Sequence, residues 1–191
     1  MSKSDRGSKG DRGVNGGGGA APTPPTPAPA PEGAGGAAVQ PRLALVTQYI
    51  KDLSFENPGA PISLAREGAA PEVGVNVDVR AHALGGDNYE ITLKLHATAK
   101  RGDKPAFVAE VEYCGLFTLQ NVPREHLEVV CLVECPRILF PFARRVMSDI
   151  TRDGGYPPLL LDMIDFIELY RRTKQQLADG TAKPSGAPPI A

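Results

Sequence analysis

The stretch VGVNVDVRAHALGGDNYEITLKLH, residues 73–96, decides the fold of this chain. Two runs within it, 73–79 and 89–95, alternate apolar and polar residues with a period of two, which is typical of strands with one buried face. GGDN, residues 85–88, lies between them and has the composition of a tight turn. The stretch therefore predicts two antiparallel strands that pair as a hairpin.

Two further runs show the same alternation. One is FVAEVEY, residues 107–113, which follows the turn-like RGDKP, and the other is YIKDLSFE, residues 49–56. Four strands in succession, followed by helical patterns, predict an α+β domain with a four-stranded antiparallel sheet. The polar face of this sheet is rich in acidic residues.

Beyond Pro123 the apolar spacing changes to three and four, which indicates helix as far as about residue 150. Pro136 suits the first turn of the second helical segment. Pro141 lacks a backbone donor, so we expect it to bend that helix or to confine its regular part to the residues beyond. DGGYPP, residues 153–158, should end the segment, and a C-terminal amphipathic helix is predicted from about Leu160 to Leu177.

Composition divides the chain into three parts. Residues 1–40 are almost wholly Gly, Ala, Pro, Ser, Thr and charged residues, and residues 178–191 have the same character. Such segments bury too little apolar surface to offset the entropy of ordering them, so we expect a disordered leader and a disordered tail. The remaining part, 41–177, is predicted to form one domain.

Net charge and apolar content exclude several classes of function. The net charge of the chain is −1, so no basic excess favours a nucleic-acid partner. No stretch approaches the roughly 18 uninterrupted apolar residues of a membrane span, and no apolar segment follows the N-terminal charges. Three cysteines are too few for a disulfide scaffold and suit a reducing compartment. We expect a cytoplasmic protein that does not insert into membranes.

Motifs for metal binding and catalysis are weak. Cys131 and Cys135 are four residues apart on one helical face and could present two ligands to zinc, but a structural zinc needs four, so buried cysteines are the favoured interpretation. His82, His96 and His126 belong to no catalytic signature. We expect no metal, no cofactor and no enzymatic activity.

Acidic pairs leave three interpretations open. Glu110 with Glu112, or Asp52 with Glu56, could serve as general acid and base, but such a pair must converge in a cleft. The alternatives are a solvated sheet face and a docking surface for a cationic partner. Residues 47–93 carry three basic side chains against seven acidic ones, a local net charge of −4, which is compatible with docking.

From Tyr49 to about Gln176 the chain resembles SecB, the bacterial export chaperone. The matching segments are KDLSFENPGAP (51–61), PEV (71–73), AFVAEVEYCGLFTL (106–119), CPRILFPFAR (135–144) and YPPLLLDMIDF (156–166). The resemblance implies a homotetramer, a dimer of dimers, that holds precursor proteins unfolded without ATP and delivers them to the SecA motor. A holdase of this kind needs apolar groove surface and sheet-edge hydrogen bonds that accept many sequences.

The resemblance also implies roles for single residues. The SecA-contacting face falls on Asp52, Glu56, Val108 and Glu110. The groove for unfolded clients falls on Val73, Val75, Val77, Phe107, Phe166, Leu169 and Tyr170. The face through which dimers associate falls on Ala109, Val111 and Tyr113.

One departure from the family pattern and one rival function stand beside this assignment. Cys114 and Gly115 occupy the place of the usual pair of glycines, which leaves it open whether position 114 needs a special backbone angle. The rival function is a chaperone of the same fold that serves a single client, such as a toxin–antitoxin system.

Overall fold

The computed structural model describes residues 40–64 and 71–180. The predicted disordered leader, 1–40, and tail, 178–191, therefore lie outside the described residues, apart from residue 40 and residues 178–180. The described part begins with strand β1 and ends just beyond helix α3.

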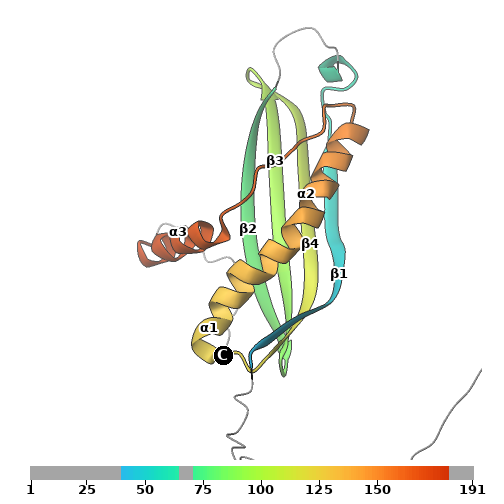
Figure 1. Cartoon of the computed structure of the whole chain (residues 1–191). Helices are drawn as coiled ribbons and strands as arrows, with labels where there is room; N and C mark the ends of the chain where they lie inside the picture. The colour runs from blue at the N-terminus through green and yellow to red at the C-terminus, as the bar shows by residue number, and fades with distance from the viewer. Residues whose placement is uncertain (1–39, 65–70, 181–191) are drawn as a thin grey trace, which may run out of the picture. The chain divides into compact units, whose positions relative to one another are not determined.

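Four strands form one antiparallel sheet, as the alternating runs predict (Figure 1). They are β1 (Arg42–Glu56), β2 (Glu72–Gly85), β3 (Asn88–Arg101) and β4 (Lys104–Gln120). The strand order is β1-β4-β3-β2, so β3 and β4 are central while β1 and β2 are edge strands. The strands are longer than the runs that predict them because the alternation continues at their ends, for example through Ala97 and Ala99 on β3.

The hairpin predicted from residues 73–96 is present. β2 pairs with β3 in antiparallel register, with Val77 opposite Leu95 and Val79 opposite Leu93. The turn between the two strands requires glycine, because Gly85 and Gly86 have φ angles of 103° and 58°. On β3, Ile91, Leu93 and Leu95 are fully buried.

Helices cover one face of the sheet (Figure 1). α1 (Arg124–Val129), a π-helical turn η2 (Val130–Glu134) and α2 (Cys135–Asp153) follow one another without a break, and α2 lies diagonally across the strands. Leu139, Phe140, Ala143 and Met147 of α2 are buried against the sheet. A single layer of helix therefore closes the core.

The expectation that Pro141 confines the regular helix to later residues is wrong, because α2 includes Pro141. Pro136 occupies the first turn of α2, as expected, although the π-helical turn precedes α2 without a break. Pro141 cannot donate to the carbonyl of Arg137, but both residues are exposed, so water can replace the missing donor. The π-helical turn ends at Glu134, two residues before Pro136.

The C-terminal helix α3 (Phe166–Ala178) starts six residues later than the predicted Leu160. The chain is not helical between α2 and α3, where Pro157 and Pro158 each favour an extended backbone at the residue that precedes them. Asp165 caps α3, since its carboxylate accepts hydrogen bonds of 3.0 Å from the N–H groups of Ile167 and Glu168. Leu160, Met163 and Ile164 thus have the spacing of a helical face, but they lie in a segment that is not helical.

An aromatic cluster ties the end of α2 to the sheet. The Phe107 ring lies between Phe55 and Tyr156, with centroid distances of 5.6 and 4.8 Å. The Tyr156 hydroxyl is 3.0 Å from the side-chain oxygen of Asn57 and donates to the carbonyl of Ala106 at 2.8 Å. No helix among residues 40–64 and 71–180 is long and apolar enough to cross a membrane.

Candidate functional site

The polar face of the sheet carries ordered ion pairs. Tyr49 donates a hydrogen bond to the carboxylate of Glu90, and the Lys51 ammonium lies 3.0 and 2.9 Å from the two oxygens of that carboxylate. Tyr49 and Lys51 belong to β1 while Glu90 belongs to β3, so these contacts span β4. The hydrogen bond from Tyr49, followed by that from Lys51, lowers the pKa of Glu90, and the same bond raises the pKa of Tyr49 to about 12.

A second network lies farther along the same face. The Lys94 ammonium is 2.6 Å from one oxygen of Glu110 and 3.3 Å from Glu112. The other oxygen of Glu110 lies 3.1 Å from Nδ1 of His96. The bond to Lys94 is the largest cause of a lowered pKa for Glu110 and, in turn, the bond to Glu110 raises the pKa of Lys94.

The structure brings the four predicted SecA-contacting residues together at one end of this polar face. Asp52 lies opposite Glu112, Glu56 lies opposite Val108, and Ser54 lies opposite Glu110 across the β1–β4 ladder. Neither Asp52 nor Glu56 forms a hydrogen bond or ion pair with any residue in the described part of the chain. Glu110 is therefore paired with Lys94 and His96, whereas Asp52 and Glu56 are unpaired among the described residues. The sequence does not reveal this difference.

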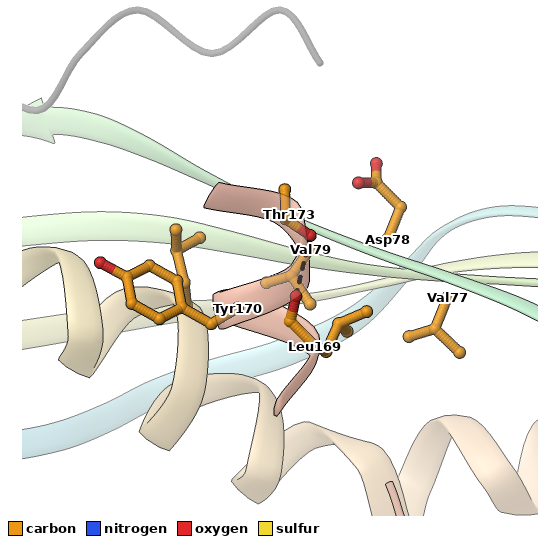
Figure 2. A pocket seen from close by; sticks show the side chains of 7 residues that line it. Val77, Asp78, Val79, Leu169, Tyr170 and Thr173 are labelled. Atoms are coloured by element: carbon orange, nitrogen blue, oxygen red, sulfur yellow. Dashed lines mark hydrogen bonds between the residues drawn. The ribbon is translucent and has the colours of Figure 1, made fainter. Parts of the chain in front are cut away.

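The predicted client groove corresponds partly to a shallow pocket between β2 and α3 (Figure 2). Its cavity volume is only about 40 Å³, enough for about one water molecule. The side chains that line it are Val77, Asp78, Val79, Leu132, Leu169, Tyr170 and Thr173. The Asp78 carboxylate points away from Val77 and Val79 in Figure 2. In this arrangement, a peptide could lie along the surface at this place but could not enter the pocket.

The other predicted groove residues have unequal access. Val73 and Val75 of the edge strand β2 are 39% and 42% exposed, so both are available to a ligand. Phe107 and Phe166 are buried, at 3% and 1% exposed, and each contacts another aromatic ring. Phe107 and Phe166 are therefore core residues that a ligand cannot reach in this structure.

Sequence reasoning missed the extended segment 157–165 as a surface element, because its apolar residues were assigned to a helix. Leu160 and Met163 are 70% and 76% exposed, whereas Leu161 between them is buried. Thr151 fixes the start of the segment, since its hydroxyl accepts a hydrogen bond of 2.9 Å from the N–H of Leu159. The paired prolines at the start of this segment, Pro157 and Pro158, were the signal for an extended conformation.

The residues predicted for dimer association lie on the helix-covered face. Ala109 and Val111 are completely buried within the single chain, and Tyr113 stacks on Phe142 of α2 with a centroid distance of 6.4 Å. Contact with a second chain on this face would therefore be made by exposed residues of α2. Exposed apolar side chains here and on the edge strand β1 include Ile138, Phe142, Val46, Ile50 and Leu53.

The cysteines are buried and free. Burial raises the pKa of Cys131 to about 12, and it also raises the pKa of Cys114 and Cys135. In the described ranges, no group of three or more His, Cys, Asp and Glu side chains is placed to hold a metal ion. Among these residues only Asn121 departs from negative φ outside glycine, so Cys114 needs no special backbone angle.

Comparison with known proteins assigns the family. The family model for preprotein translocase subunit SecB matches residues 36–177. The protein-export protein SecB of Parvibaculum lavamentivorans is 49% identical over 152 residues, which cover 78% of this chain and 90% of that protein. SecB of Agrobacterium fabrum is also 49% identical, over 81% of this chain and 94% of that protein.

A solved structure supports the same fold. The SecB-like chaperone Rv1957 of Mycobacterium tuberculosis, in complex with a ChAD peptide from the HigA1 antitoxin, aligns with a TM-score of 0.53 at 15% identity. The alignment covers 64% of this chain and 91% of the mycobacterial protein. The family model and the relatives, whose matches extend over most of their lengths, show that the chain belongs to the SecB family.

Proposed function

We propose that this chain is an ATP-independent, cytoplasmic holdase chaperone that keeps precursor proteins unfolded and delivers them to the SecA motor. The observation that carries the proposal is the match of the SecB family model over residues 36–177, joined by relatives named protein-export protein SecB. SecB is a chaperone family, which supports the expectation that the chain has no enzymatic activity. We propose 41–177 as the chaperone domain.

The β2 edge and α3 are proposed to form the client groove. Val73 and Val75 lie on an edge strand that has a neighbour, β3, on one side only, so its free side can accept backbone hydrogen bonds from an extended peptide. Val77, Leu169 and Tyr170 line the adjacent pocket, whereas Phe107 and Phe166 are buried in the core. Backbone pairing with shallow apolar contacts suits a chaperone that must accept many sequences.

Asp52, Glu56, Val108 and Glu110 are proposed as the SecA contact. The support is electrostatic and geometric, because the four residues share one end of the polar face and two of the carboxylates have no partner in the described part of the chain. Charges at the rim of an interface mainly raise the association rate. The partner segment should therefore carry Lys or Arg.

We propose that the chain assembles as a homotetramer, a dimer of dimers. The face that includes Ala109, Val111 and Tyr113 would reach a second chain through α2, whose Phe142 stacks on Tyr113. Exposed Ile50 and Leu53 on the edge strand β1 supply a second apolar surface. Several grooves on one assembly can bind one client together, which raises the overall affinity without new contacts.

Service to a single client, such as a toxin–antitoxin system, is the second candidate function. The observation that favours it is the fold similarity to a SecB-like chaperone that binds an antitoxin peptide. That protein is only 15% identical to this chain, whereas the relatives named protein-export protein are 44–49% identical. General export is therefore the better-supported function.

An aggregation assay on a urea-diluted precursor tests the proposal. The wild-type chain should suppress light scattering by the diluted precursor and should not bind the same precursor after it has folded. Val75→Asp should weaken this protection by about tenfold or more, because it places a charge where an apolar contact is expected.

Leu84→Asp is the matched control, because Leu84 is an exposed apolar residue toward the opposite end of the same strand. We expect Leu84→Asp to protect the precursor as the wild type does. Equal protection by Val75→Asp, with the variant folded, would exclude the β2 edge as the client site. Absence of protection by the wild type would contradict the holdase function itself.

A further inference from the structure

The polar face of the sheet is not uniformly open to a cationic partner. Asp52 on β1, Glu112 on β4, Lys94 on β3 and Asp78 on β2 are successive partners across the ladder and form one row. Lys94 is the only basic residue in this row, and its ammonium lies between the carboxylates of Glu112 and Glu110. One cation of the protein itself therefore already binds two of the acidic groups of this face.

The carboxylates of the proposed SecA contact fall into two kinds. Both oxygens of Glu110 are engaged, one by Lys94 at 2.6 Å and the other by His96 at 3.1 Å. Asp52 and Glu56 have no such partner among the described residues. The side chains of Lys94, Glu110 and Glu112 are only 26%, 23% and 20% exposed, so solvent screens this cluster less than it screens a free surface pair.

We infer that Lys94 determines the affinity of this docking surface by competing with the partner's cations for Glu110 and Glu112. A partner would pair with Asp52 and Glu56 directly, and it would have to displace or share Lys94 to pair with Glu110. The inference rests on the proposed function for the location of the SecA contact. Beyond that location, the inference states that Asp52 and Glu56 are unpaired among the described residues and that Lys94 pairs with Glu110 and Glu112.

The opposite role for Lys94 would be to hold Glu110 in the correct position for the partner. The geometry favours competition. His96 holds one oxygen of Glu110, and the 2.6 Å contact with Lys94 uses the other oxygen, which a cation of the partner would otherwise bind. His96 and the strand backbone would still position Glu110 without Lys94. Removal of the ammonium would also leave Asp52, Glu110 and Glu112 as three neighbouring negative charges, which attract a cation more strongly.

The test uses the full chain and the variant Lys94→Gln, with Lys174→Gln as the matched control. Lys174 forms an ion pair of 2.8 Å with Glu128 on the helical side, so its replacement removes the same charge and also frees a carboxylate. Binding is measured with two probes, fluorescein-labelled octalysine and purified SecA, each at low and at high salt. Lys94→Met replaces Lys94→Gln if circular dichroism shows that the glutamine variant is unfolded.

We expect Lys94→Gln to bind octalysine about fivefold more tightly than the wild type at low salt, and to lose most of this gain at high salt. Lys174→Gln should stay within about twofold of the wild type. Equal shifts in both variants, or weaker binding by Lys94→Gln, would overturn the inference. The octalysine result decides the role of Lys94, whereas failure of the wild type to bind SecA would contradict the proposed function instead.

Discussion

Glu90 connects the edge strand β1 to the centre of the sheet, because both Tyr49 and Lys51 bind its carboxylate across β4. β1 needs such a connection, since its ladder to β4 is irregular between Leu45 and Thr47 and again between Ile50 and Asp52. A charged acceptor makes each of these hydrogen bonds stronger than a neutral one would be. The bridge should therefore contribute measurably to the stability of the edge.

Tyr49→Phe should lower the free energy of unfolding by about 0.5–1 kcal/mol at pH 7, because it removes one partly exposed hydrogen bond to a charged group. The pKa of Glu90 is lowered in the folded chain, so the stability that this carboxylate contributes is present above its unfolded pKa and is lost as the pH falls through the folded pKa. Urea unfolding of both proteins at pH 7 and in acid checks this expectation. A difference between them that persists when Glu90 is protonated would contradict the assignment.

The three cysteines should not react with DTNB in the folded protein at pH 8. All three are buried, and a raised pKa keeps their thiols protonated, whereas only the thiolate attacks the reagent. Three thiols should become reactive in concentrated urea. A rapid reaction of any one thiol before unfolding would show that its site opens in the native state.

At the residue scale, sequence alternation indicates which side chains point to the polar face but not which carboxylates are neutralised. The pairing of Lys94 with Glu110 and of Lys51 with Glu90 depends on which strands are neighbours. That order is a property of the whole sheet. The acidic face expected from the sequence is therefore only partly open.

At the element scale, the strands were predictable because the alternation of Val, Leu and Ile with polar residues is nearly unbroken. α3 was misplaced because apolar spacing alone does not separate a helix from an extended segment with alternating burial. Leu161 is buried between the exposed Leu160 and Met163, and Asp165 supplies the cap that starts the helix at Phe166. Capping residues would have located this helix start better than apolar spacing did.

Asp165→Ala should destabilise the start of α3 by about 1 kcal/mol, because the N–H groups of Ile167 and Glu168 lose their acceptor. Hydrogen exchange of the first turn of α3 should become faster, and client binding should weaken because Leu169 and Tyr170 are held less firmly. Asp165→Asn is the matched control, since asparagine also caps helices well. Faster exchange in both variants to the same degree would show that the negative charge, and not the hydrogen bonds, stabilises this end.

At the scale of the whole molecule, the order β1-β4-β3-β2 places two different edge strands at opposite sides of one sheet. The β2 edge presents Val73 and Val75 on the strand whose Val77 and Val79 line a pocket with α3. The β1 edge presents Ile50 and Leu53 on the face to which Tyr113 belongs. Alternation within single strands could not reveal this separation. The proposed division between client binding and self-association follows from it.

The most direct test of the chaperone function is light-scattering mass on a sizing column, for the protein alone and then with a urea-diluted precursor or the same precursor in its folded state. The account predicts the mass of about four chains, and a further gain in mass only with the unfolded precursor. A monomer, or a tetramer that takes up neither form of the precursor, would contradict the holdase function.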